Sequence, residues 1–468
     1  MATQAAVLAA VDQELEGSIA RWIELLKIPS ISTDPAYRGD CRKAGQWLVG
    51  TLKALGFDAA LRDTSGHPVV VAHYRAKQRR PRVPHVLFYG HYDVQPADPL
   101  EKWQTPPFEP VRRRDKDATE RIYARGAADD KGQLLTFVEA SRAWLAAAGD
   151  LPLDVSVLFE GEEESGSPSL IPFLKANRKE LAHDVALVCD TNMWDARTPA
   201  ITTRLRGLLH DAVTITGPAV DLHSGLYGGA AMNPIRVLAG IIADLHDRTG
   251  RIAIPGFYDG VKELPKATRQ QWAKLKFSER KFLAEVGLRE RAGEARRSLL
   301  EQIWSRPTAE VNGIIAGYTG AGTKTVIPSQ AAAKFSFRLV AGQDPMRLRK
   351  AFHGFVRARL PVGVKADFHP EGGASPAIEI AEDNPYLASA GRALKAEFGR
   401  APVMMGCGGS IPIVRSFKDI LGMESLLVGF GLNDDAIHSP NEKYDVASFH
   451  RGIRSWARIM AGLADTPA

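Results

Sequence analysis

Apolar positions along the chain follow first a helical and then a strand-like spacing. Steps of three and four residues separate Leu8, Val11, Leu15, Ile19, Trp22 and Leu26, which predicts one amphipathic helix ending before Pro29. Short apolar runs predict strands at 57–62, 68–74, 85–89, 153–159 and 185–189, and helices are expected at 42–55, 133–148 and 169–178. Strands that alternate with helices predict an α/β sheet with helices on both faces.

The pattern changes after Arg204 and returns near Asn384. Strands are expected at 208–216, 311–318, 332–339 and 364–368, with helices at 233–247 and 346–360. This combination predicts an α+β domain with an antiparallel sheet and helices on one face. Residues 255–307 are charged and helix-prone, and we interpret them as an insertion. From 384 a helix, a glycine-rich loop at 406–409, a strand at 426–430 and a final helix from Val446 are expected.

The length and composition of the chain allow two domains and argue against nucleic-acid and membrane partners. The chain has 468 residues, of which 45% are hydrophobic, enough for more than one core. The net charge of +6 is spread among 54 acidic residues, without the aromatic residues that single-strand binding uses, so no nucleic-acid partner is expected. Cys41, Cys189 and Cys407 lie far apart, and no signal peptide or membrane span is evident. We therefore expect a cytoplasmic protein without a membrane partner.

Acidic and histidine residues gather where predicted strands end. His91 and Asp93 lie in GHYDVQP, Glu163 and Glu164 in EGEEESGS, and Asp190 directly follows ALVC. In α/β sheets, ligands bind beyond the carboxyl ends of the strands. Residues about a hundred positions apart are therefore expected at one edge of the sheet.

These residues, with Asp129 and His438, match what a site for two divalent metal ions requires. Such a site needs one shared carboxylate, here Asp129, and a histidine and a carboxylate for each ion. The expected pairs are His91 with Asp190 and His438 with Glu164. Mixed nitrogen and oxygen ligands favour zinc, with manganese or cobalt as alternatives. Because His438 must join this cluster, the α+β domain is expected to be inserted into the first.

Two further carboxylates have expected roles beside the metal ions. Asp93 is placed to orient the imidazole of His91. Glu163 diverges from its neighbour Glu164 and is free to act as a general base. Each of these features, taken singly, also has an ordinary structural interpretation. His91 fits a histidine at the end of a strand, the Glu162–Glu164 run fits a solvated loop, and Asp190 and His438 fit turn residues. The metal hypothesis depends on their combination.

The chain resembles the dinuclear-zinc exopeptidase family of carnosinase, cytosolic nonspecific dipeptidase, aminoacylase, acetylornithine deacetylase and succinyl-diaminopimelate desuccinylase. The resemblance covers nearly the whole chain through eight motifs in order: GHYDVQP, RGAADDKG, EGEEESGS, DLHSGLYGG, GTKTVIPS, FRLV, GGSIP and HSPNEKY. It implies a three-layer α/β/α zinc-exopeptidase-like catalytic domain (1–205 and 381–468) and an inserted α+β lid and dimerisation domain (206–380). It also implies the ligand assignments above and a cis peptide bond between Asp129 and Asp130.

The resemblance further assigns residues that contact the substrate. His223 is similar to a histidine that reaches across a homodimer to stabilise the oxyanion. Arg338, Thr325 and Ser410 are similar to contacts for the substrate carboxylate and the oxyanion side. Ala128 departs from the dipeptidase branch, which often has a small hydroxyl residue there, and the 255–307 insertion is a second departure.

The motifs around EES, DLHSG and GGSIP are most similar to the dipeptidase branch. We expect an exopeptidase that hydrolyses the peptide bond next to a free C-terminal carboxylate, using a hydroxide bound by two metal ions and Glu163 as general base. A deacylase of N-acyl amino acids with the same metal site is the alternative. A non-catalytic scaffold with this fold is disfavoured because Glu163 and all five proposed ligands are present.

Overall fold

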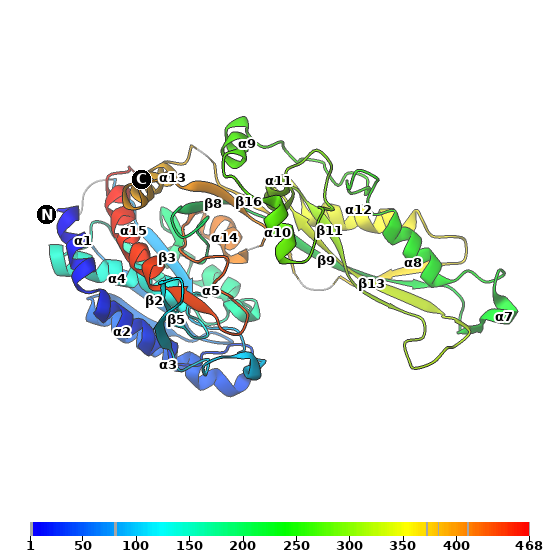
Figure 1. Cartoon of the computed structure of the whole chain (residues 1–468), viewed down its shortest axis with the longest axis horizontal. Coiled ribbons are helices and arrows are strands. Elements are labelled where there is room, and N and C mark those ends of the chain that lie inside the picture. Colours follow the sequence, from blue (N-terminus) through cyan, green and yellow to red (C-terminus); the bar gives the residue numbers. More distant parts are fainter. Residues whose placement is uncertain (1–2, 79–81, 371–372, 382, 410, 468) are drawn as a thin grey trace. The chain divides into compact units, whose positions relative to one another are not determined.

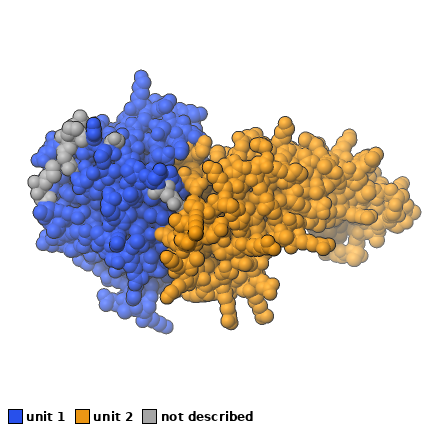
Figure 2. Space-filling view, turned by 90° about the horizontal axis from the view of Figure 1, so that it is seen from above, with its two compact units in different colours: residues 1–203, 380–405, 416–468 blue, residues 204–379, 406–415 orange. Residues whose placement is uncertain are grey.

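The computed structural model describes residues 3–78, 82–370, 373–381, 383–409 and 411–467. The chain forms two compact units (Figure 2): unit 1 comprises residues 1–203, 380–405 and 416–468, and unit 2 comprises residues 204–379 and 406–415. Residues 406–415 group with unit 2, whereas the boundaries expected from the sequence place them in the catalytic domain. One contact of this segment with unit 2 is a hydrogen bond from the Nε of Arg206 to the carbonyl of Gly408 (3.0 Å).

The sheet of unit 1 is built from continuous apolar strands. Its order is β1 (Asp58–Arg62), β2 (Val69–Tyr74), β6 (Val155–Glu160), β3 (Val86–His91), β7 (Val185–Val188), β18 (Glu424–Leu427) and β8 (Ala200–Leu205). β3 is parallel to both β6 and β7, and β7 is parallel to β18. Every residue of β3, β6 and β7 is buried, as expected for parallel strands covered on both faces.

Helices cover both faces of this sheet. Phe88 of β3 stacks on Phe137 of α4 (Lys131–Ala148), with ring centroids 3.9 Å apart, and meets Trp456 of α15 (Val446–Ala464) edge-on. Its neighbour Tyr89 contacts Phe417 of the helical turn η4 (Phe417–Leu421). Successive strand residues point to opposite faces, so α4 and α15 lie on one side and η4 on the other. The three-layer α/β/α arrangement is confirmed (Figure 1).

The opening segment forms two helices, where the apolar spacing predicts one. α1 (Gln4–Gln13) and α2 (Leu15–Leu26) are separated at Glu14, whose φ of −95° and ψ of 8° are not helical. Both helices bury apolar faces, including Val11 and Trp22. The apolar residues form one buried stripe that continues across both helices. Their spacing therefore does not reveal a break of one residue between the helices.

The remaining elements of unit 1 surround this sheet. They are η1 (Pro35–Tyr37), α3 (Arg38–Ala54), η2 (Leu100–Lys102), η3 (Glu163–Ser165), α5 (Leu170–Ala176), α6 (Arg178–Leu181) and α13 (Pro385–Phe398). A small separate sheet has the order β19 (Lys443–Asp445), β5 (Glu120–Tyr123), β4 (Val111–Arg114). β17 (Val403–Cys407) pairs with β8, and it crosses the boundary between the units. No helix in the described part of the chain combines the length and apolar character needed to cross a membrane.

Unit 2 is an α+β structure with an antiparallel sheet. The order is β11 (Thr308–Ala316), β13 (Gln330–Leu339), β9 (Gly207–Thr216) and β14 (Lys365–Phe368), and β15 (Ala374–Ser375) also pairs with β9. Alternating residues of β9 and β13, among them Val213 and Phe335, form a core with Leu238 of α8 (Pro234–Ala243) and Phe352 of α12 (Pro345–Arg357). This alternation is typical of a sheet buried on one face.

The smaller elements of unit 2 lie outside this sheet, and several of them belong to residues 255–307. β10 (Leu222–His223) pairs with β12 (Val326–Ile327), and α7 (Ser224–Tyr227) follows β10. The insertion forms α9 (Lys266–Ala273), α10 (Glu279–Glu285) and α11 (Leu299–Trp304). The other elements are α14 (Pro412–Ser416) and β16 (Ile378–Glu379), which pairs with the end of β8.

Candidate metal centre

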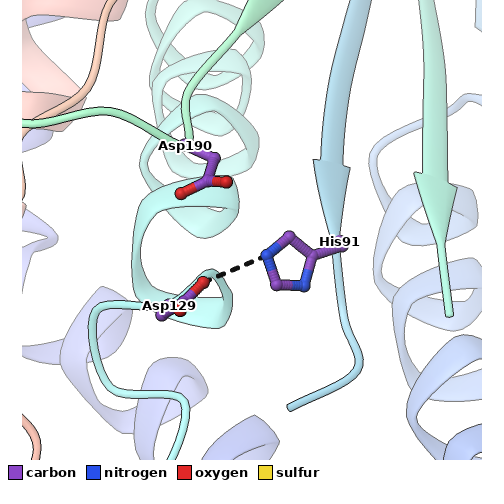
Figure 3. A group of neighbouring side chains, drawn as sticks. All are labelled: His91, Asp129 and Asp190. Atoms are coloured by element: carbon purple, nitrogen blue, oxygen red, sulfur yellow. Dashed lines mark hydrogen bonds and ion pairs between the residues drawn. The ribbon is translucent and has the colours of Figure 1, made fainter. Parts of the chain in front are cut away.

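Three of the expected ligands meet at the carboxyl edge of the sheet in unit 1. His91 is the last residue of β3, Asp190 follows β7, and Asp129 precedes α4. Their ligand atoms all lie within 4.8 Å of one another. The side chains point toward one another (Figure 3), and the Nε2 of His91 lies 3.1 Å from the Oδ1 of Asp129.

A second group shares Asp129 with the first. The Nε2 of His438 lies 3.0 Å from the Oδ2 of Asp129 and 3.3 Å from a carboxylate oxygen of Glu164. These three residues also offer ligand atoms within 4.8 Å of one another. Asp129 therefore presents one oxygen to each group. The peptide bond between Asp129 and Asp130 is cis, as the family resemblance implies.

The charges of this cluster are strongly coupled. Burial disfavours the charged form of His91, but hydrogen bonds to Asp129 and Asp93 raise its pKa well above the usual value. Burial would raise the pKa of Asp129, yet its bonds to His438 and His91 lower it below the usual range. The shared carboxylate is therefore held as an anion, the form that binds a cation.

Other carboxylates in the cluster are crowded and poorly hydrated. Burial, with repulsion from Asp129, raises the pKa of Asp190 to about 7. Burial also raises the pKa of Glu163 to about 8. Positive charge placed among these groups would offset their repulsion. A donor set of two imidazoles and three carboxylates, divided into two groups with one shared member, fits two divalent ions such as zinc.

Asp93 contacts both His91 and the loop that carries Glu163 and Glu164. Its carboxylate accepts the backbone N–H groups of Glu163 (3.2 Å) and Glu164 (3.0 Å). The Nδ1 of His91 lies closer to the main-chain oxygen of Asp93 (3.0 Å) than to its carboxylate (3.4 Å). Either contact leaves Nε2 directed toward Asp129. Asp93 thus fixes the position of the expected base and of one expected ligand at once.

Comparison with known proteins identifies the family of this chain. A model described as peptidase family M20/M25/M40 matches residues 87–462. The chain belongs to this family. It is similar to the Cys-Gly metallodipeptidase of Candida albicans, with 32% identity over 93% of this chain and 92% of the relative. It is also similar to the human Beta-Ala-His dipeptidase, with 28% identity over 96% and 90% of the two chains.

A solved structure of an M20 family metallo-carboxypeptidase from Sulfolobus solfataricus has the same fold. The TM-score is 0.80 and the identity 30%, over 96% of this chain and 99% of the other. Membership of the M20 family makes the chain a hydrolase and confirms the resemblance stated from the eight motifs.

Three residues that contact the candidate site were given no role by the sequence-based reasoning. The Nε2 of Gln95 donates to Glu164 (2.6 Å), and Asp130 accepts the backbone N–H of His91 (3.1 Å). Glu442 is fully buried and bonded to the loop that carries Asp129. Gln95 and Glu442 lie inside the quoted motifs GHYDVQP and HSPNEKY. Their place within these motifs is the sequence feature that could have pointed to a role at the site.

The residues expected to contact substrate lie in unit 2. His223 is exposed on β10, and its Nδ1 accepts the N–H of Gly225 (3.0 Å). The carbonyl of Thr325 accepts the N–H of Ser224 (3.1 Å), which places Thr325 beside His223. Arg338 is half-buried near the end of β13, where it pairs with Leu208 of β9. Ser410 lies outside the described residues.

Proposed function

We propose that this M20 chain is a metal-dependent dipeptidase that hydrolyses the peptide bond next to a free C-terminal carboxylate. The observation that carries the proposal is the pair of ligand groups sharing Asp129, with Glu163 on the adjoining loop. Relatives at 28–32% identity that span almost the whole chain bear dipeptidase names. They favour this reading over the N-acyl amino acid deacylase.

The proposed metal ligands are His91, Asp129 and Asp190 for one ion and Asp129, Glu164 and His438 for the other. Zinc is the proposed metal, with manganese or cobalt as alternatives. Divalent ions bound here would polarise the scissile carbonyl and lower the pKa of a bound water. Glu163 is proposed to take the proton of the attacking water and to pass it to the leaving amine. Its high pKa, caused by burial, suits a group that must both accept and release a proton.

Arg338 is the proposed contact for the carboxylate of the substrate, and Ser410 is proposed as a further carboxylate contact. Burial and then the nearby charge of Arg338 lower the pKa of Arg206 to about 10. Two guanidinium groups close enough to repel each other form a region that attracts an anion. A planar guanidinium can bind both oxygens of a carboxylate, which favours substrates with a free C-terminus.

His223 and Thr325 are proposed to act in the active site of a partner subunit. Arg338 and Gln330 are eight residues apart on β13, which is about 26 Å at the rise of a strand. His223 and Thr325 lie beyond the Gln330 end, where α7 marks the far end of unit 2 (Figure 1). A dipeptide is only about 7 Å long. His223 and Arg338 of one chain therefore do not reach the same substrate, whereas residues of two chains can.

The proposed homodimer would form through unit 2. β11 is the last strand on its side of the described sheet, and its Ile314 and Ile315 are 59% and 69% exposed. Ile235, at the start of α8, lies beside Gly317 just after this strand. Exposed apolar residues on an edge strand are typical of an interaction surface. Because the Nδ1 of His223 accepts a hydrogen bond, its neutral form carries the proton on Nε2, ready to donate to an oxyanion.

The deciding experiment measures hydrolysis of one mixed panel by mass spectrometry. The panel contains free dipeptides, tripeptides, and N-acetyl and N-succinyl amino acids, offered to protein loaded with zinc, manganese or cobalt. Cleavage of free dipeptides is expected. Cleavage confined to the acylated compounds would move the function to a deacylase, and efficient removal of single residues from tripeptides would favour a carboxypeptidase.

A cytoplasmic location remains part of the proposal and is supported by three free cysteines.

A further inference from the structure

Glu442 accepts four hydrogen bonds with its two carboxylate oxygens. Oε1 accepts the backbone N–H groups of Ala128 (2.9 Å) and Asp129 (3.0 Å). Oε2 accepts the N–H of Gly126 (2.8 Å) and the Nη1 of Arg125 (2.8 Å). The side chains of Glu442 and Arg125 are 0% and 1% exposed. Bonds to a buried carboxylate are strong and directional, so the loop 125–129 is held along its whole length.

Arg125 extends the same network to a third motif. Its Nη2 donates to the carbonyl of Pro96 (3.1 Å), at the end of GHYDVQP, and its guanidinium lies over the ring of Trp103. Glu442 itself lies four residues after His438. One buried ion pair therefore joins the loops that carry His91, Asp129 and His438.

The loop around Glu442 is itself fixed in place. The N–H of Ala124 donates to the carbonyl of Glu442 (3.1 Å), and the next residue, Lys443, pairs with Tyr123 in the β19–β5 ladder. The carboxylate of Glu442 and the side chain of His438 thus approach Asp129 from one short segment. A shift of Glu442 would move the main chain at Asp129, whose two oxygens face the two groups.

We propose that Glu442 is a positioning residue that sets the shared ligand Asp129 for both metal ions, with Arg125 as its counterion. The inference rests on the proposed dinuclear site. Loss of the Glu442 carboxylate should weaken the binding of both ions, because the ligand common to them is displaced. Loss of a ligand that belongs to one group should weaken the binding of one ion only.

The test compares cobalt binding by metal-free variants, measured by isothermal titration calorimetry and by the visible absorption of bound cobalt. In Glu442→Gln an NH₂ group replaces one acceptor, so two of the four donors lose their partner. We expect the Kd for both cobalt ions to rise by about 10- to 100-fold, the effect typical of residues that hold metal ligands in place. His438→Ala should weaken one of the two binding events.

Glu139→Gln is the matched control. Glu139 is also buried and accepts bonds from Ser18 (3.0 Å), Arg21 (2.9 Å) and Arg142 (3.0 Å), but these donors lie in α2 and α4 and not in the metal loops. Its loss should lower the thermal stability of the metal-free protein and leave both Kd values unchanged. Because Glu442→Gln could prevent folding, Arg125→Met supplies a second variant. It removes the counterion and the link to Pro96, and it too should raise both Kd values.

Two results would overturn the proposal. One is a folded Glu442→Gln or Arg125→Met protein that binds both cobalt ions as wild type does. The other is a Glu442→Gln protein that, like Glu139→Gln, loses thermal stability but keeps both Kd values, which would make the role of Glu442 purely structural. Wild-type protein that binds two cobalt ions but hydrolyses no dipeptide would defeat the proposed function and leave the positioning role standing.

Discussion

Complementation between two inactive variants tests the proposed role of His223 across a dimer. Glu163 and the proposed metal ligands lie in unit 1, and His223 lies in unit 2 about 26 Å or more from Arg338 along the sheet. Glu163→Gln should lower kcat by about 100-fold or more, because the proton acceptor is lost. His223→Ala should lower kcat by about 100- to 1,000-fold, the usual cost of removing an oxyanion donor.

A hybrid dimer of these two variants should recover activity. One of its sites combines an intact Glu163 from the His223→Ala chain with an intact His223 from the Glu163→Gln chain, and the other site has neither. With two identical sites per dimer, the hybrid should show about half of the wild-type kcat. It should therefore exceed each inactive homodimer by about 50-fold or more. The assay uses two affinity tags to purify the hybrid and follows dipeptide hydrolysis at saturating substrate.

A hybrid dimer that stays inactive would refute the proposed role of His223 in the partner's site. If His223 serves the site of its own chain, both sites of the hybrid lack one essential residue, and its activity stays at the level of the inactive variants. A hybrid of Glu163→Gln with Arg338→Ala is the control. Arg338 is proposed to act with Glu163 of its own chain, so each site of this hybrid lacks one of the two residues and its activity should stay low.

Three further predictions follow from named contacts. Ile315→Asp places a charge on the exposed edge strand β11 and should convert the proposed dimer to a monomer in light scattering, with loss of activity. Glu163→Asp keeps a carboxylate but withdraws it, so kcat should fall while KM changes little, and an equal rise in KM would argue for a binding role. Burial and the adjacent His85, stacked at 3.5 Å, lower the pKa of His183 from 6.5 to about 3. Neutral His183 therefore stabilises the fold above about pH 6.5, and this stability is lost as the pH falls; about 1 to 2 kcal/mol should disappear between pH 7.5 and pH 5. His183→Asn should lose less in urea unfolding over that range, and equal losses would contradict the assignment.

The spacing of apolar residues predicted most of the architecture because burial imposes it. The β3 strand is apolar from Val86 to Tyr89 and buried at all six positions, so it could be recognised without its neighbours. The convergence of His91 and Asp190 also followed, since β3 and β7 are parallel and side chains after parallel strands meet at one edge. The break at Glu14 between α1 and α2 could not be predicted in this way, because the apolar stripe continues across it.

Grouping of the loop 406–409 with unit 2 was also beyond the sequence. One of its contacts joins a main-chain carbonyl, that of Gly408, to the side chain of Arg206 about two hundred positions away. A glycine in a sequence indicates that the backbone can be approached closely. It does not indicate which side chain makes the approach.

Glu442 shows the same limit at the metal centre itself. Metal ligands can be found from sequence because their side chains carry the chemistry: an imidazole or a carboxylate after a strand is visible as a letter. The partners of Glu442 are mostly backbone N–H groups of Gly126, Ala128 and Asp129, which every residue except proline possesses. Ala128 illustrates the consequence. The resemblance to the dipeptidase branch implies a small hydroxyl residue at position 128, yet the contact of Ala128 with Glu442 is through its main chain. The bond would survive that substitution, whereas replacement of Glu442 would not leave it intact.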